Sequence, residues 1–346
     1  MEQKKFDIIL HAPNVHSGGG MVLLSSLLSS PTFKVKFMQL DFRVKHQLHF
    51  PVNTSSRYVY RSVFSRLCAE LRLWQHTKAS DVVLCFHGLP PLLPLRGRVV
   101  VFVQNRLLFE ISSLEDYPFF IRYRLMTERL WTRLMQRNCN QYIVQTPSMK
   151  NIVLNCLGVD CLVNVMPFAP TEDSFTSNIS SEFEKKYDFV YVSSGEAHKN
   201  HINLLEAWRL LADVGFRPSL ALTINRQSFP DLSAEISSYI LDYGLNIINL
   251  DQVPITDISN LYLSSGALIF PSKTESFGLP LIEAFRLGVP TLASELDYVR
   301  DLINPVDTFD PNSPISIARA VRRFLGCAEP TVQIRSVEEF FAEVIK

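Results

Sequence analysis

A chain of 346 residues is long for one hydrophobic core, which predicts two domains. The composition, with 47% hydrophobic residues, 20% charged residues and zero net formal charge, excludes a disordered chain. No stretch approaches the ~20 apolar residues that span a bilayer, and we expect no signal peptide. The six cysteines include no Cys-x-x-Cys pair, which indicates reduced thiols of a cytosolic protein rather than a zinc site.

Short apolar runs alternate with helical patterns along the chain, which predicts α/β layers with parallel sheets. A polar, proline-containing stretch over residues 166–187 predicts a linker, so we place one domain at residues 1–167 and a second at residues 168–336. Strands are expected at residues 6–10, 81–86, 99–103 and 141–145 in the first domain and at residues 189–192, 220–224, 246–250, 266–272 and 291–293 in the second.

A glycine loop follows the first predicted strand. The run Ser17-Gly18-Gly19-Gly20 precedes a helix expected from Met21, so its backbone amides can approach an anion across a cleft. A purely structural tight turn is the alternative. A dehydrogenase is not favoured, because the spacing lacks Gly-x-Gly-x-x-Gly and no acidic residue follows a second strand in the expected place.

The charge divides unequally between the two halves. Residues 1–165 contain 20 Lys and Arg against 10 Asp and Glu, whereas residues 166–346 contain 14 against 24. Arginines are interleaved with aromatic residues at positions 57–66 and 119–137, a pattern typical of surface helices that lie on anionic lipid. Core-facing helices with solvated arginines are the alternative. Nucleic acid is not favoured as a partner, because no recognition motif accompanies the charge.

Two loops in the second half are suited to hold a diphosphate. The first begins at Gly195, precedes a helix and carries Lys199 as a point charge. The second, residues 275–283, leads into a helix whose first amides, near Leu279 and Leu281, and positive dipole end favour an anion.

The local chemistry of this second loop supports a helix start close to a ligand. Gly278 lets the backbone approach a ligand, and Pro280 suits the first helical turn. Glu283 is expected within that turn, where partnership with the helix dipole is the alternative to ligand binding. Glu275 has no such alternative explanation.

The segments Phe270-Pro271-Ser272, Glu275-Ser276-Phe277-Gly278-Leu279-Pro280 and Glu283-Ala284 resemble the signature of the retaining GT-B glycosyltransferases of family 4. The similarity covers most of residues 188–300. It implies a GT-B fold, in which two Rossmann-like domains face each other across a cleft. The first domain would bind the acceptor and the second the nucleotide sugar, with residues 337–346 packing back on the first.

The resemblance also implies roles for individual residues. Glu275 would face the hydroxyls of the donor sugar, and Glu283 would take the ribose hydroxyls. Lys199 would be catalytic through its contact with the diphosphate. The residues expected to hold the donor are Gly18, Gly19, Gly195, Lys199, Arg226, Val253, Phe277, Gly278, Leu279, Leu281 and Glu283.

Two positions depart from the family pattern. Glu196 stands where many relatives carry an arginine, and Arg226 could supply the missing charge or be a plain surface residue. Many relatives place a histidine after the strand expected at residues 99–103, where this chain has Gln104-Asn105-Arg106. The catalytic candidates for facing the sugar are therefore His87 and Asn105, with His11 and His16 as further alternatives.

The resemblance thus implies transfer of a sugar from a nucleoside diphosphate to a hydroxyl with retained configuration. The absence of an Asp-x-Asp motif agrees with a reaction that needs no metal, and we expect no cofactor. The expected acceptor is a glycan or a polyprenyl-diphosphate-linked sugar in bacterial O-antigen or capsule synthesis. The basic first domain would bind an anionic membrane surface at the cytoplasmic face. The alternatives are an epimerase or phosphorylase of the same fold, or a non-catalytic sugar-nucleotide-binding subunit.

Overall fold

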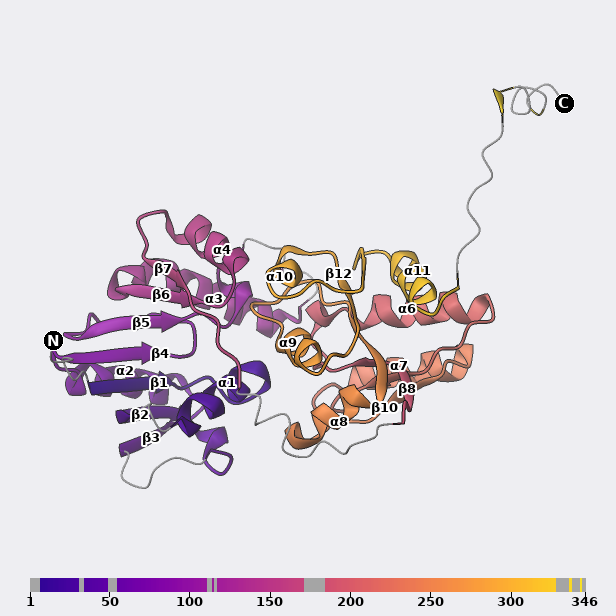
Figure 1. The fold of residues 1–346 in the computed structure, drawn as a ribbon. Coiled ribbons are helices and arrows are strands. Elements are labelled where there is room, and N and C mark those ends of the chain that lie inside the picture. The colour runs from indigo at the N-terminus through magenta and orange to yellow at the C-terminus, as the bar shows by residue number, and fades with distance from the viewer. Residues whose placement is uncertain are drawn as a thin grey trace.

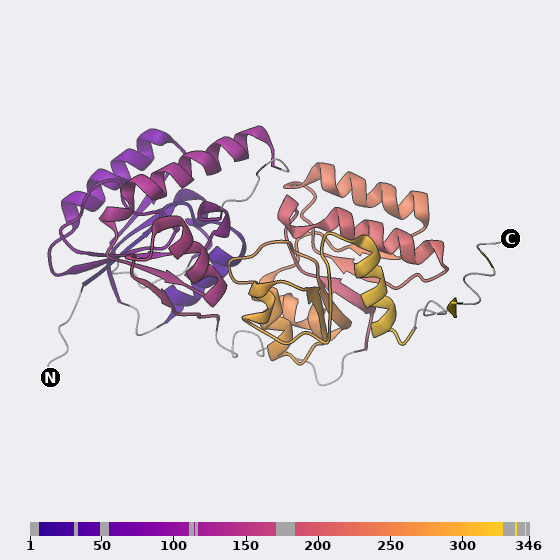
Figure 2. The same ribbon diagram turned by 90° about the horizontal axis from the view of Figure 1, so that it is seen from above.

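The computed structural model describes residues 7–30, 34–48, 55–110, 114, 117–170, 184–327, 336, 337 and 343. These residues form two α/β domains that lie beside each other (Figure 1). The view from above shows the same division, with indigo to magenta elements in one domain and pink to yellow elements in the other (Figure 2).

The first domain is built on a sheet of seven parallel strands in the order β3-β2-β1-β4-β5-β6-β7. The strands are β1 (Asp7–Ala12), β2 (Val35–Asp41), β3 (Ser55–Val59), β4 (Asp81–Cys85), β5 (Arg98–Phe102), β6 (Gln141–Val144) and β7 (Val163–Val165). The α-helices among its described residues are α1 (Gly18–Ser29), α2 (Val63–His76), α3 (Phe119–Met135) and α4 (Pro147–Leu157). Short 3₁₀ turns are η1 (Phe42–Val44), η2 (Arg106–Leu108) and η3 (Gln136–Asn138).

The second domain has six parallel strands in the order β10-β9-β8-β11-β12-β13. The strands are β8 (Tyr187–Tyr191), β9 (Leu220–Leu222), β10 (Ile247–Asn249), β11 (Ser265–Phe270), β12 (Thr291–Ser294) and β13 (Asp307–Phe309). The helices are α6 (His201–Asp213), α7 (Pro230–Tyr243), α8 (Ile258–Leu263), α9 (Leu279–Arg286), α10 (Asp297–Arg300) and α11 (Pro314–Phe324), with 3₁₀ turns η4 (Ala197–Lys199) and η5 (Ile255–Asp257).

Both sheets follow the strand order of a Rossmann domain, in which the order reverses between the first and fourth strands and ligands bind outside the carboxyl ends. The predicted fold class of two parallel α/β domains is confirmed. The boundary placed at 167/168 falls between β7 and β8, and the predicted return of residues 337–346 lies outside the described residues except for residues 337 and 343.

Each predicted strand is present, but β2, β3, β7 and β13 were not predicted. In β2, Lys36, Gln39 and Asp41 interrupt the apolar run, and buried Gln39 is satisfied by His11 and the carbonyl of Ala69. The expected surface helix at residues 57–66 is wrong in its first part, because that stretch is divided between β3 and the start of α2. The segment at residues 119–137 is helical, as α3 and η3.

An apolar cluster joins the two domains beneath the proposed cleft. Phe277 and Leu279, which flank Gly278, pack with Phe86, Phe102 and other buried residues of the first domain. A second contact comes from α4, where Ser148 N donates to Asp301 Oδ2 at 2.9 Å. Packing therefore fixes the start of α9 against the carboxyl end of the first sheet.

Candidate active site

The start of α9 follows β11 at the carboxyl end of the second sheet. Gly278 has φ 82° and ψ 56°, a left-handed conformation that glycine adopts without strain, and Pro280 lies in the first turn. The N–H of Leu281 already bonds to the carbonyl of Gly278 at 3.0 Å, so a bound diphosphate would have to share it.

Lys199 and Glu275 meet at the same edge. The Lys199 Nζ atom lies 2.6 Å from Glu275 Oε1, and the side chains are 16% and 11% exposed. Two hydrogen bonds fix the loop at residues 195–200, which we call the lysine loop, against the sheet. Tyr191 OH donates to the Lys199 carbonyl at 2.8 Å, and Asn200 Nδ2 donates to the Pro271 carbonyl at 3.0 Å. The structure therefore brings together the two residues that the sequence assigned to the diphosphate and the donor sugar.

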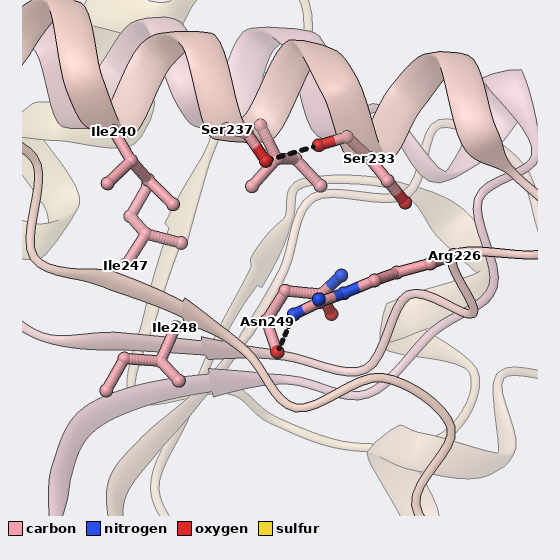
Figure 3. Close-up of a pocket in the computed structure, with 8 residues that line it drawn as sticks. Arg226, Ser233, Ser237, Ile240, Ile247, Ile248 and Asn249 are labelled. Carbon is pink, nitrogen blue, oxygen red and sulfur yellow. Dashed lines mark hydrogen bonds between the residues drawn. The ribbon is translucent and has the colours of Figure 1, made fainter.

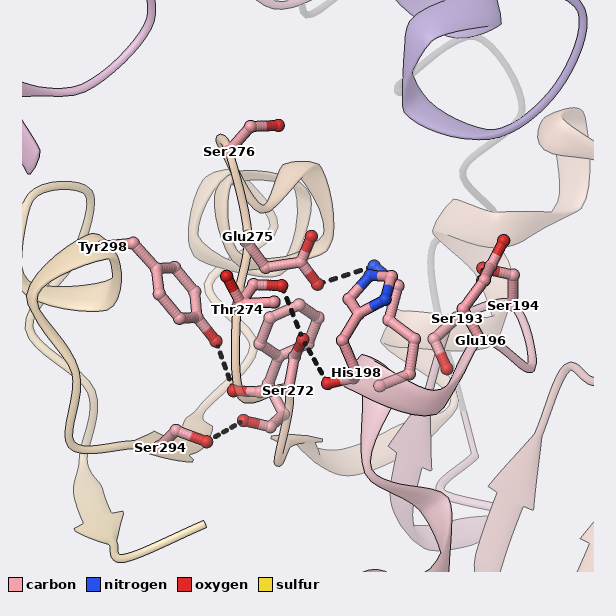
Figure 4. Close-up of polar contacts among 12 residues, drawn as sticks. Ser193, Ser194, Glu196, His198, Ser272, Thr274, Glu275, Ser276, Ser294 and Tyr298 are labelled. Atoms are coloured by element: carbon pink, nitrogen blue, oxygen red, sulfur yellow. Dashed lines mark hydrogen bonds and ion pairs between the residues drawn. The ribbon is translucent and has the colours of Figure 1, made fainter. Parts of the chain in front are cut away.

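Further hydrogen bonds support the loop that carries Glu275 (Figure 4). The His198 carbonyl accepts from Ser272 Oγ at 3.2 Å, and Tyr298 OH donates to the Ser272 carbonyl at 2.8 Å. Because Tyr298 is fully buried, its hydrogen bond ties the loop to the core of the second domain. Glu275 is therefore presented by a supported loop.

Glu283 is buried in the second turn of α9. It accepts a hydrogen bond from Tyr262 OH at 3.0 Å, and burial raises its pKa to about 7. No acidic residue lies in the first turn of α9, so the expectation that placed Glu283 there as a partner of the helix dipole is wrong. Its assignment to the ribose stays a prediction.

The raised pKa would make nucleotide binding sensitive to pH if Glu283 holds the ribose as predicted. An ionised Glu283 would then accept two ribose hydroxyls, so we expect affinity for a nucleoside diphosphate to rise as pH increases through about 7. In the ligand-free protein the sign is opposite: the stability linked to this group is complete below pH 4.5 and is lost as pH rises through about 7. Calorimetric titration of wild type across this range measures the first effect and chemical denaturation the second.

Two variants check this assignment. Glu283→Gln should weaken nucleotide binding by about 1.5–3 kcal/mol at high pH and remove the pH dependence. Tyr262→Phe should move the affinity profile to higher pH, because the Tyr262 bond lowers the pKa of Glu283. An unchanged dissociation constant in Glu283→Gln would return this residue to a structural role.

The glycine loop lies against the start of α9. A Cβ atom on Gly19 would lie 3.2 Å from Leu279 Cδ1, and one on Gly20 would lie 2.5 Å from Gln104 Oε1. Gly18 has φ 61° and begins α1, so this helix starts before the expected Met21. Gly19 is thus brought to the predicted diphosphate site from the opposite domain, whereas a Cβ atom on Gly18 would meet no atom within 4 Å.

Gly195 and Glu196 have local explanations. A Cβ atom on Gly195 would lie 2.5 Å from Phe229 Cγ, so the missing side chain leaves room for this ring. Glu196 is exposed and accepts a hydrogen bond from Ser194 Oγ. The structure therefore gives Gly195 a packing role beside its predicted contact with the donor.

Arg226 lies apart from Lys199 in its contacts. Its side chain is 63% exposed, lies 4.0 Å from Asp251 and donates to the Asn249 carbonyl at 3.2 Å. It lines a pocket of about 320 Å³ between α7 and β10, together with Ser233, Ile240 and Ile247 (Figure 3). The described contacts give no support for a second charge on the diphosphate. Val253, one of the residues expected to hold the donor, packs against the core of the second domain.

The four candidates for facing the sugar are engaged elsewhere. His87 is enclosed: its Nδ1 bonds to the His11 carbonyl, its Nε2 accepts from Arg66, and burial holds its pKa well below the usual value. Asn105 Oδ1 caps η2 by accepting from Leu107 N at 3.0 Å. His11 and His16 also use both ring nitrogens, His11 with Gln39 and Glu70, and His16 with Asn14 and Arg43.

Gln104 was overlooked by the sequence reasoning. Its carbonyl accepts from Ser276 Oγ at 2.7 Å, beside Glu275, and its side-chain oxygen approaches Gly20. Within the described residues its buried Nε2 atom has no hydrogen-bond partner. The available signal was its position, since it comes directly after the apolar run of β5 and one residue before the candidate Asn105.

Other contacts cross between the domains at this point. Thr274 Oγ1 donates to Glu110 Oε2 at 3.3 Å, and Tyr117 OH lies 3.2 Å from His198 Nδ1. The site is therefore composite. The lysine loop and the loop at residues 275–283, which we call the motif loop, come from the second domain, while the glycine loop and Gln104 come from the first.

Comparison with solved structures defines the class of fold. The chain matches Anabaena Alr3699/HepE, solved with UDP and glucose, with a TM-score of 0.68, 14% identity and coverage of 93% of this chain and 90% of that one. Sucrose-phosphate synthase from Thermosynechococcus elongatus gives the same TM-score, identity and coverages. The chain has the GT-B fold, as predicted.

Sequence comparison then gives the family that this chain resembles. Residues 173–336 match the family described as glycosyl transferases group 1. O-antigen chain mannosyltransferase B of Escherichia coli is 29% identical over 138 residues, which are 39% of this chain and 36% of that protein. The amylovoran biosynthesis glycosyltransferase AmsD of Erwinia amylovora is 23% identical over 281 residues, or 78% and 74% of the two chains. The matched stretch thus spans about a third of the first relative.

Proposed function

We propose that this protein transfers a sugar from a nucleoside-diphosphate sugar to a hydroxyl of a glycan or polyprenyl-diphosphate-linked acceptor, with retained configuration. The observation that carries the proposal is the meeting of Lys199 and Glu275 beside the start of α9, under the glycine loop. The names of the relatives favour bacterial surface polysaccharide synthesis, and mannose is the first donor sugar to test.

The geometry suits a reaction whose main requirement is the stabilisation of negative charge on the leaving diphosphate. As the bond from the anomeric carbon to the phosphate oxygen breaks, the Lys199 ammonium and the amides of α9 stabilise that charge. The acceptor oxygen bonds to the anomeric carbon on the same face, and its proton passes to the leaving phosphate. Glu275 is reserved for sugar hydroxyls and the orientation of Lys199, so no covalent glycosyl-enzyme is proposed.

Gln104 replaces His87 and Asn105 in this proposal as the residue of the first domain that faces the sugar. Its buried Nε2 atom lies beside the glycine loop and the motif loop. A sugar or phosphate oxygen there can accept hydrogen bonds from the N–H groups of this atom. Both ring nitrogens of His87 are bonded within the fold, and the side-chain oxygen of Asn105 caps η2.

The reaction is proposed to need neither a cofactor nor a metal. Within the described ranges, no cluster of three His, Cys, Asp or Glu side chains has metal-binding geometry. We expect chelators to leave turnover unchanged, measured as product formed with and without EDTA at fixed substrate. Loss of activity that added Mg²⁺ or Mn²⁺ restores would contradict metal independence.

We place the enzyme at the cytoplasmic face of the membrane, with its basic first domain toward anionic lipid and no role for nucleic acid. The charge division of 20 basic against 10 acidic residues in positions 1–165 supports this placement. Among the described residues, no helix combines the length and apolar character needed to cross a bilayer.

A two-stage experiment tests the function. Thermal shifts with a panel of nucleoside diphosphates identify the base, since a ligand at 100 times its dissociation constant stabilises by about 2.7 kcal/mol. The matching nucleotide sugars are then incubated with and without a lipid-linked acceptor, and the anomeric configuration of the product is read by NMR. Sugar interconversion without acceptor indicates an epimerase, phosphate-dependent cleavage indicates a phosphorylase, and binding without turnover indicates a non-catalytic subunit.

A further inference from the structure

Helices α2 and α3 lie next to each other on one outer face of the first domain (Figure 2). Arg66 of α2 stacks over the Trp131 ring of α3 at 5.4 Å, which ties the two helices together. Both helices turn large apolar side chains outward as well as inward. Because a helix on a soluble domain normally buries its apolar stripe, the outward residues require an explanation.

On α3 the outward apolar residues recur at intervals of three and four positions, which places them on one stripe. They are Phe119, Tyr123, Met126, Leu130 and Leu134, and Phe120 beside them is 84% exposed. The opposite side of α3, with Leu125 and Thr132, is buried.

On α2 the same arrangement recurs. Its outward residues are Val63, Phe64, Leu67, Leu71 and Trp74, of which Phe64 is 76% exposed, while Ala69 and Leu73 face the core. We call the outward apolar residues of both helices the α2–α3 ridge.

The charges around the ridge select an anionic partner. Exposed arginines flank it at positions 57, 61, 72, 124, 133 and 137. The acidic residues of the two helices, Glu70 and Glu128, are turned inward and are 2% and 19% exposed. A second copy docking through the same face would bring like charges together, whereas anionic lipid offers both an apolar layer and the opposite charge.

The geometry points to the α2–α3 ridge as a surface that inserts into the interface of an anionic membrane, with Phe64 and Phe120 entering the acyl boundary. This goes beyond attraction by charge alone, and its use for acceptor delivery rests on the proposed function. Phe119 lies two residues from Tyr117, whose hydroxyl touches His198 in the lysine loop. Docking through this ridge therefore brings the membrane surface to the edge of the composite site.

Trp74 provides a native probe of insertion. It lies on the ridge and is 44% exposed, whereas Trp208 is buried and Trp131 is half-buried against Arg66. With vesicles of equal parts phosphatidylcholine and phosphatidylglycerol, we expect a blue shift of its fluorescence and quenching by lipids brominated on the acyl chain. Trp74→Phe should remove that signal.

Co-sedimentation with the same vesicles measures affinity. Phe64→Ser and Phe120→Ser should each weaken binding about tenfold. Leu241→Ser, which alters an 81% exposed leucine on α7 of the other domain, is the matched control and should bind as wild type. Arg124→Gln with Arg133→Gln should weaken binding at low salt and have less effect at high salt. Unchanged thermal midpoints show that the variants remain folded.

Three results would overturn the inference: no quenching of Trp74, equal vesicle binding by wild type and both phenylalanine variants, or lipid-free dimerisation that these variants abolish. The assays contain no donor or acceptor. Their failure therefore leaves transfer to a soluble acceptor untouched, and failure of transfer leaves vesicle binding interpretable.

Discussion

Replacing Lys199 by alanine is expected to lower kcat for sugar transfer by about 10²–10³-fold while changing KM for the donor much less. The Nζ atom of Lys199 is held by Glu275 at the carboxyl edge of the second sheet, close to the start of α9. In the proposed reaction, charge on the diphosphate grows as the glycosidic bond breaks, so the ammonium should contribute more to the transition state than to the bound donor. Steady-state kinetics over a range of donor concentrations separates the two constants.

A neighbouring lysine provides the control for loss of charge. Lys273 lies two residues before Glu275, and its side chain is exposed. Its backbone N–H donates to the His198 carbonyl, and this bond remains when the side chain is replaced. Lys273→Ala should leave kcat within a few-fold of wild type. A Lys199→Ala enzyme that only raises KM would place this lysine in ground-state binding.

Replacing Glu275 by alanine is expected to reduce transfer by a similar ~10²–10³-fold while leaving the affinity for the free nucleoside diphosphate within a few-fold. The carboxylate is assigned to the donor sugar, and the free nucleotide has no sugar at that position. Calorimetry with the nucleoside diphosphate and with the intact nucleotide sugar, together with turnover, measures both parts. Comparable activity in the mutant would end the assignment.

The ion pair complicates single substitutions, because removing one partner leaves a largely buried charge uncompensated. Glu275→Gln keeps the shape and removes the charge, so comparison with Glu275→Ala separates hydrogen bonding from electrostatics. A double-mutant cycle of Lys199 and Glu275 then gives their coupling. If the residues act as one unit, the double variant should lose little more than either single variant.

Some features were determined by the sequence itself because their causes are local. Parallel strands covered on both faces form continuous apolar runs, so β1, β4, β8 and β11 could be recognised without tertiary information. The start of α9 depends on the backbone freedom of Gly278 and the fixed φ of Pro280. The loop that carries Lys199 and the loop at residues 275–283 were each predicted to hold a diphosphate, and the shared edge formed by the carboxyl ends of parallel strands accounts for their meeting.

Tertiary structure decided the features that depend on partners distant in the chain. Gln39 is tolerated inside β2 because His11 bonds to it, which no local pattern shows. His87 and Gln104 both follow strands of the first sheet, and both side chains can form hydrogen bonds. His87 is bound by Arg66, whereas Gln104 keeps a buried amide nitrogen without a partner among the described residues.

The orientation of an amphipathic helix is the clearest case of this division. The periodicity of α3 predicts a helix with apolar and basic residues, but both its inward and outward sides carry apolar side chains. Which side is buried depends on how Leu125 and Trp131 pack against the rest of the first domain. The sequence therefore determined that α3 forms, and only packing decided that Phe119, Tyr123 and Leu130 remain exposed for a partner.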